Sequence, residues 1–216
     1  MHYTRYFLLL ILTLFVSTNV RAELHEDHPY EFEIHQDAYM MSTHFMIESK
    51  DTYMGRIKKS SARIVTCYDL ADKHGWQATG VMNPFSLGLV YTWASEIYIH
   101  DTRKVTIACI DGQVVTGSAA QFSIYQYDDS GRYKRIAIAY LDRDLDSFSV
   151  LYPDGSPIPI AKLQRIFVNG GVDYWKVKVF QPESIDDRVI RIFAAFVVDH
   201  QDDFKPKVEE EIIEDE

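Results

Sequence analysis

The sequence predicts a mainly β protein: a closed antiparallel β-barrel of about twelve strands around one hydrophobic C-terminal helix. Most of the chain consists of short segments rich in Tyr, Phe, Ile and Val, separated by Asp, Gly, Ser and Pro, which is typical of strands and turns. One late segment, residues 189–198, does not alternate, because every residue in it except Arg191 is apolar. A helix with so little polar surface must be enclosed, and a closed barrel encloses it economically.

The apolar segment and its flanks predict the central helix over about residues 186–199. Ser184 and Asp187 have the spacing of a capping box, with Asp in place of the usual Glu. Ala194 and Ala195 favour a helix, because a buried strand prefers β-branched residues. A fully buried central strand is the alternative, since short apolar runs fit both. The helix side chains expected in the core are Ile192, Phe193, Phe196 and Val197.

One domain, residues 30–204, is expected to hold the strands and the helix. Residues 23–29, "ELHEDHP", are predicted to be a flexible arm, and residues 205–216 a disordered acidic tail. The predicted strands span residues 30–35, 43–48, 53–58, 63–68, 90–93, 96–100, 104–110, 121–127, 133–140, 147–152, 158–167 and 174–180.

The N-terminus has the pattern of a secretory signal peptide over residues 1–22. Arg5 precedes an apolar run over residues 6–16, and Ala22 suits cleavage by signal peptidase. An uncleaved anchor is the alternative, but the run is well short of the ~20 residues of a spanning helix. We therefore expect an exported protein, periplasmic or extracellular, with no transmembrane segment in the mature chain.

The charge and the motifs exclude several classes of function. A net charge of -10 argues against nucleic acid, whose binding depends on basic contacts to phosphates. The sequence contains no P-loop, dinucleotide fingerprint, G-x-S-x-G or H-E-x-x-H. We therefore expect no cofactor and predict an uncharacterised lipid or protein as the partner. An exported enzyme with an active site in its surface loops is the alternative.

Two cysteines, Cys67 and Cys109, remain after the predicted cleavage. In an oxidising compartment an even count permits a disulfide. The sequence fits equally well with two small buried residues on separate strands.

The only basic cluster is "RIKKSSAR", in a predicted hairpin. Basic side chains gathered on one turn can meet a phosphate or an anionic headgroup. A solvated turn without a ligand is the simpler interpretation. The candidate ligand-binding residues are Arg56, Lys58, Lys59 and Arg63.

Two segments suggest metal ligands. Cleavage after Ala22 would place His25 third in the mature chain, where its imidazole, the free amine and two backbone amides suit square-planar Cu(II) or Ni(II), with His28 nearby. Chance placement of a histidine there is the alternative. The three alternate acids Asp142, Asp144 and Asp146 resemble the start of a calcium loop, but the run lacks the sixth-position Gly and the twelfth-position carboxylate.

The segment "DYWKVKVFQPESIDDRVIRIFAAFVVD", after about a dozen strands, resembles the tubby-like superfamily, especially its LURP-one-related and phospholipid scramblase branches. The resemblance implies a twelve-stranded barrel threaded by a C-terminal helix. It also implies lipid ligands, which tubby domains bind through basic surface residues, and calcium near Asp173, although "QPESIDD" departs from the scramblase pattern. We thus expect an exported, non-enzymatic binding or scaffold protein. Aromatic strand faces that include Tyr98, Tyr125 and Tyr127 offer a partner surface, and core packing is the ordinary use of such residues.

Overall fold

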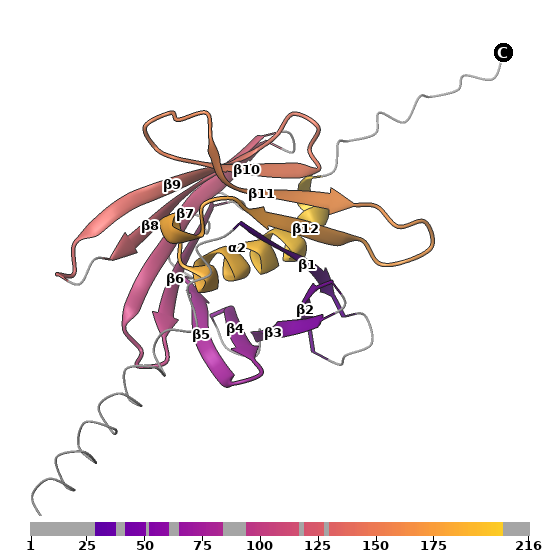
Figure 1. Ribbon diagram of the computed structural model, residues 1–216, viewed down its shortest axis with the longest axis horizontal. Coiled ribbons are helices and arrows are strands. Elements are labelled where there is room, and N and C mark those ends of the chain that lie inside the picture. Colours follow the sequence, from indigo (N-terminus) through magenta and orange to yellow (C-terminus); the bar gives the residue numbers. More distant parts are fainter. Residues whose placement is uncertain are drawn as a thin grey trace, which may run out of the picture.

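Twelve antiparallel strands close into a barrel around one helix (Figure 1). The structure is a computed structural model that describes residues 29–37, 42–50, 52–60, 65–83, 94–116, 119–127 and 130–204. Each strand pairs with its neighbour in the sequence, and the first strand pairs with the last, with Tyr30 opposite Val179. The predicted fold class is therefore confirmed.

The strands are 5 to 11 residues long, and their inward side chains alternate with polar ones, as a sheet with one buried face requires. They are β1 (Tyr30–Gln36), β2 (His44–Ser49), β3 (Thr52–Ser60), β4 (Cys67–Asp72), β5 (Gly75–Met82), β6 (Ala94–Asp101), β7 (Thr106–Thr116), β8 (Ala119–Tyr127), β9 (Tyr133–Leu141), β10 (Ser147–Leu151), β11 (Pro159–Ile166) and β12 (Tyr174–Val179).

The predicted strands differ from the observed ones mainly in one region. The strand expected at residues 63–68 begins later, as β4, and β5 was not predicted. The strand expected at residues 90–93 lies outside the described residues, as do the predicted signal peptide, most of the arm and the acidic tail.

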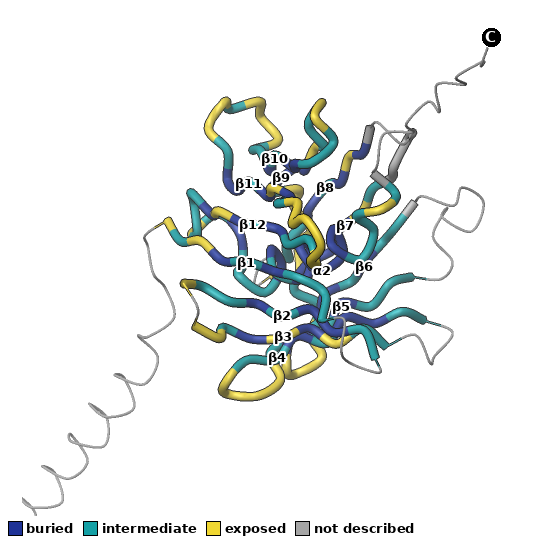
Figure 2. The backbone as a smooth tube through the Cα atoms, turned by 90° about the vertical axis from the view of Figure 1, so that its right-hand side faces the viewer, coloured by how far each residue is buried: buried dark blue, intermediate teal, exposed yellow. Residues whose placement is uncertain are grey.

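Helix α2 (Asp187–Asp199) lies inside the barrel, as Figures 1 and 2 show from two directions. Its first turn is capped by Asp186, whose side chain accepts a hydrogen bond from the Arg188 backbone N–H. Ser184 is not the cap; it belongs to the short 3₁₀ helix η2 (Pro182–Ser184), and its hydroxyl lies 2.5 Å from that of Tyr152. Within the described residues, no helix has the length and apolar character needed to cross a membrane.

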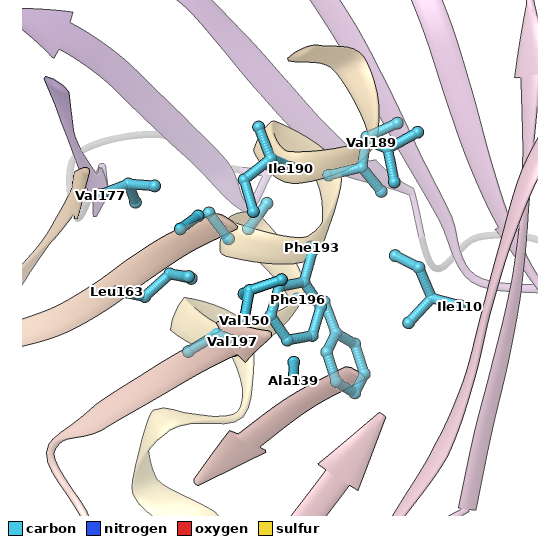
Figure 3. Packing of buried hydrophobic residues seen from close by; sticks show 14 of the residues in the cluster. Ile110, Ala139, Val150, Leu163, Val177, Val189, Ile190, Phe193, Phe196 and Val197 are labelled. Atoms are coloured by element: carbon cyan, nitrogen blue, oxygen red, sulfur yellow. The ribbon is translucent and has the colours of Figure 1, made fainter. Parts of the chain in front are cut away.

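The core lies between α2 and the barrel wall (Figure 3). The Phe193 ring packs edge-on against Phe122 and Phe148, at centroid distances of 5.7 and 5.8 Å. Phe196 approaches Phe122 to 5.4 Å, again edge-on, the arrangement that aromatic rings prefer. The four predicted core residues, Ile192, Phe193, Phe196 and Val197, are all buried.

One glycine lets the helix approach the wall closely. A Cβ atom at Gly80 on β5 would lie 2.8 Å from Ile192 Cγ2 and 3.2 Å from Ile97 Cγ2. Both distances are shorter than normal carbon–carbon contact, so only glycine fits without repacking.

Polar contacts fix the C-terminal end of the helix at one mouth of the barrel. Asp199 accepts hydrogen bonds from Lys59 Nζ (2.8 Å) and from the Tyr68 hydroxyl (2.7 Å). Next along the chain, Gln201 in η3 (Gln201–Phe204) accepts from Trp175 Nε1 through its side chain and from Arg165 Nη1 through its backbone. Burial of α2 is thus combined with specific anchors on β3, β4, β11 and β12.

Candidate functional site

The barrel interior is occupied by the helix. The buried side chains of the helix and the inward-facing side chains of the strands form one cluster, part of which Figure 3 shows. A ligand of this fold is therefore expected to meet side chains of the outer surface or of the loops.

Four tyrosines gather on the outer face of β6, β8 and β9; we call Tyr98, Tyr125, Tyr127 and Tyr133 the tyrosine patch. The Tyr125 and Tyr133 rings are stacked, with centroids 4.4 Å apart and planes 6° from parallel. Tyr127 lies directly opposite Tyr133, with ring centroids 5.0 Å apart. Tyr133 is the most open of the four at 46% exposure.

Strand register brings the patch together around a thiol. Cys109 on β7 lies between Tyr98 of β6 and Tyr125 of β8 in the same row. It faces outward but is fully buried, and its side chain hydrogen-bonds with Tyr133. Burial raises the pKa of the Cys109 thiol to about 11, and nearby Glu96 adds to the effect. This thiol is therefore a packing residue beneath the patch, since thiolates are the reactive form.

Two carboxylates border the patch. Glu96 on β6 lies opposite Asp111 on β7. Glu96 accepts hydrogen bonds from the Tyr98 hydroxyl (2.7 Å) and from Asn83 Nδ2 (2.6 Å). The bond to Glu96 raises the pKa of Tyr98, and partial desolvation together with the Glu96 charge raises the pKa of Asp111.

The patch has the composition of a binding surface. Arg135 lies opposite Tyr125 in the register and is exposed, so the outer face combines tyrosine rings, hydroxyls, carboxylates and a guanidinium. Tyrosine and arginine are enriched in the centres of protein interfaces. Sequence reasoning identified Tyr98, Tyr125 and Tyr127 as possible partner residues but missed Tyr133, because the pairing of β8 with β9 was not known.

The basic cluster predicted from the sequence does not form one surface. Arg56 and Lys58 are exposed on the outer face of β3. Lys59 is on the opposite face and forms an ion pair with Asp199 at 2.7 Å, where its side chain is 24% exposed. Arg63 lies outside the described residues.

The possible disulfide does not form: Cys67 and Cys109 are not bonded to each other. They share one row of the barrel, in which Cys67 is opposite Val81, Val81 opposite Tyr98, and Tyr98 opposite Cys109. Three strand spacings of ~4.8 Å separate them, about twice the largest Cα–Cα distance that a disulfide spans. The alternative of two buried cysteines on separate strands is correct.

The predicted metal ligands are only partly described. His25 and His28 lie outside the described residues. In the acidic run, the Ser147 hydroxyl lies 2.9 Å from Asp142 and 3.0 Å from Asp144. Within the part of the chain that the structure describes, no three His, Cys, Asp or Glu side chains are arranged to hold a metal ion.

Two further groups of charged residues stabilise the fold. Asp173 is the residue near which the family resemblance implied calcium. Its Oδ2 atom lies 2.8 Å from Arg165 Nη2 and forms an ion pair with it. His200 Nδ1 lies 2.9 Å from Asp203, and its ring lies 4.6 Å from that of Phe196. Both groups lie next to the C-terminal end of α2. Among the described residues, the polar partners of the His200 side chain are the carboxylates of Asp203 and Asp199, and no serine or cysteine side chain is bonded to it.

Comparison with family models and with curated proteins gives no match for this chain.

Proposed function

We propose that this chain is an exported, non-enzymatic binding or scaffold protein of tubby-like fold. The tyrosine patch is its contact surface for a protein partner. The observation that carries the proposal is the gathering of Tyr98, Tyr125, Tyr127 and Tyr133 on the outside of a barrel whose interior is occupied by its own helix.

The physical properties of the patch suit protein binding. Tyrosine offers a large contact area at a small cost in conformational entropy, because it has only two side-chain torsions. The Tyr133 ring is stacked on Tyr125 and makes a tilted contact with Tyr127, and this mutual support reduces that cost further. Their hydroxyls and the neighbouring Arg135 supply the hydrogen bonds that give an interface its specificity.

The test is a matched pair of tyrosine variants. Tyr133 is 46% exposed within the patch, and Tyr140 is 38% exposed on the same strand but outside it. The exported protein is crosslinked in its native compartment as wild type, Tyr133→Ser and Tyr140→Ser. A partner that is retained by wild type and Tyr140→Ser but lost from Tyr133→Ser supports the proposal. Equal retention by all three variants contradicts it.

The proposed export has its own measurement. Sequencing of the N-terminus of the recovered protein is expected to give Glu23 as the first residue, as cleavage after Ala22 requires. A chain recovered inside the cell with Met1 in place contradicts export.

A further inference from the structure

The turn between β11 and β12 exposes three apolar side chains. Phe167 is 62% exposed, Val168 40% and Val172 46%; we call residues 167–172 the hairpin tip. Figure 1 shows the hairpin in orange, reaching beyond the body of the barrel. Apolar residues exposed together, rather than singly, indicate an interaction site.

The hairpin tip is a firmly supported turn. The Gly171 backbone N–H donates to the Val168 carbonyl at 3.1 Å, and the Val168 N–H donates to Asp173 Oδ1 at 3.0 Å. Arg165 holds Asp173 through its Nε and Nη2 atoms, at 3.1 and 2.8 Å. The guanidinium carbon lies 4.9 Å from the centre of the Phe167 ring. Binding through this tip therefore requires little additional ordering of the chain.

The basic side chains at the base of the hairpin are already compensated. The Arg165 guanidinium, with its side chain 6% exposed, lies 2.8 Å from Asp173 and 3.6 Å from Asp202. Lys176 lies 2.9 Å from Glu31. An anionic ligand would compete with these internal carboxylates and would be repelled by the net charge of -10. The charge distribution therefore favours an uncharged partner.

We infer that the hairpin tip inserts into the interface of an uncharged, zwitterionic phospholipid bilayer. The tip protrudes from the barrel (Figure 1), so its apolar side chains can be buried at the boundary between headgroups and acyl chains, and interfacial binding strengthens with the apolar area buried there. Tyr174, half-buried at the base beside the tip, has the amphipathic ring that is enriched at membrane interfaces. The tyrosine patch lies on β6, β8 and β9, another part of the barrel wall, so this inference is independent of the proposed function.

The experiment measures binding of the exported protein to phosphatidylcholine vesicles by flotation, at low and at high salt. The variants are Phe167→Ser and the matched control Ile158→Ser, which removes a 56% exposed apolar side chain from the loop between β10 and β11. All proteins share the same N-terminus, so its contribution cancels. We expect Phe167→Ser to lower the partition coefficient about ten-fold, from the transfer of one phenyl side chain. Ile158→Ser and the salt concentration should have little effect.

A second readout places the tip itself. In Phe167→Trp, the new indole should be quenched by bromine-labelled lipid in phosphatidylcholine vesicles, beyond the quenching of the three native tryptophans. Circular dichroism and the melting temperature establish that each variant is folded. The inference is overturned by equal binding of Phe167→Ser and wild type, by binding that needs phosphatidylserine and disappears in high salt, or by no binding at all. It is also overturned if Phe167→Ser instead abolishes a dimer in gel filtration.

Discussion

A methyl group at Gly80 probes the closest approach between the helix and the barrel. In Gly80→Ala the new Cβ would lie 2.8 Å from Ile192 Cγ2 and 3.2 Å from Ile97 Cγ2. Overpacking of this kind costs about 1–3 kcal/mol, and the lower chain entropy of alanine in the unfolded state returns about 0.4–1 kcal/mol. The net expected loss is about 1.5 kcal/mol of the free energy of unfolding. For a domain of this size, that lowers the melting temperature by about 3–6 °C.

A double-mutant cycle identifies the cause. Ile192→Ala removes the Cγ2 atom that meets the new methyl group, and alone it should cost about 2–5 kcal/mol. Together with Gly80→Ala it should cost less than the sum of the two, by about 1 kcal/mol. Phe193→Ala is the control, since its ring packs on Phe122 and Phe148 of other strands; it should be additive with Gly80→Ala. Urea denaturation gives each free energy. Additivity with Ile192→Ala, or a neutral Gly80→Ala, would refute the close contact.

Four further predictions concern the core, the thiol, alkaline pH and the N-terminus. Phe193→Ala should cost about 3–5 kcal/mol in urea denaturation, and a cost near zero would mean an exposed helix. Cys109, with its pKa raised to about 11, should resist iodoacetamide at pH 8 in the native protein and react after unfolding; rapid native labelling would contradict its burial. Burial raises the pKa of Tyr68 above its ordinary value of 10.0, so its contribution to stability is present below pH 10 and is lost as the pH rises further. Tyr68→Phe should therefore flatten the alkaline decline in melting temperature, and an unchanged slope would be evidence against this role. His25→Ala should abolish the visible band of square-planar Cu(II) in mature protein titrated with copper, and equal bands in both proteins would remove that site.

The helix could be predicted from the sequence because its signal is local. Residues 189–198 are all apolar except Arg191, and a helix with so little polar surface must be buried whatever the rest of the chain forms. β5 was missed because Gly75 and Gly80 weaken the strand pattern. Gly80 is nevertheless required there, since the helix passes too close to the wall for a side chain. The need for glycine at this position arises only when α2 packs against β5, so the sequence alone does not reveal it.

Lys59 is a single residue whose role was set by the tertiary structure and not by the local sequence. Its neighbours in the sequence suggested a basic surface cluster, yet it lies on the same face of β3 as Ile57 and meets Asp199 at the end of the helix. The partner is 140 residues away in the chain. No local pattern distinguishes this lysine from Lys58, which is exposed on the other face.

The sequence by itself determined that strands of alternating character surround an apolar helix, because periodicity and burial are properties of each segment. Only the tertiary structure decided which outward side chains meet. Tyr98, Cys109 and Tyr125 form one row because β6, β7 and β8 pair in a particular register. The register between β8 and β9 shifts between Ile124 and Tyr125, and this shift determines which residues of β9 lie next to the row. A shift of one residue would turn these side chains to the opposite face. The candidate site therefore depends on the register between neighbouring strands, which sequence patterns within single strands do not specify.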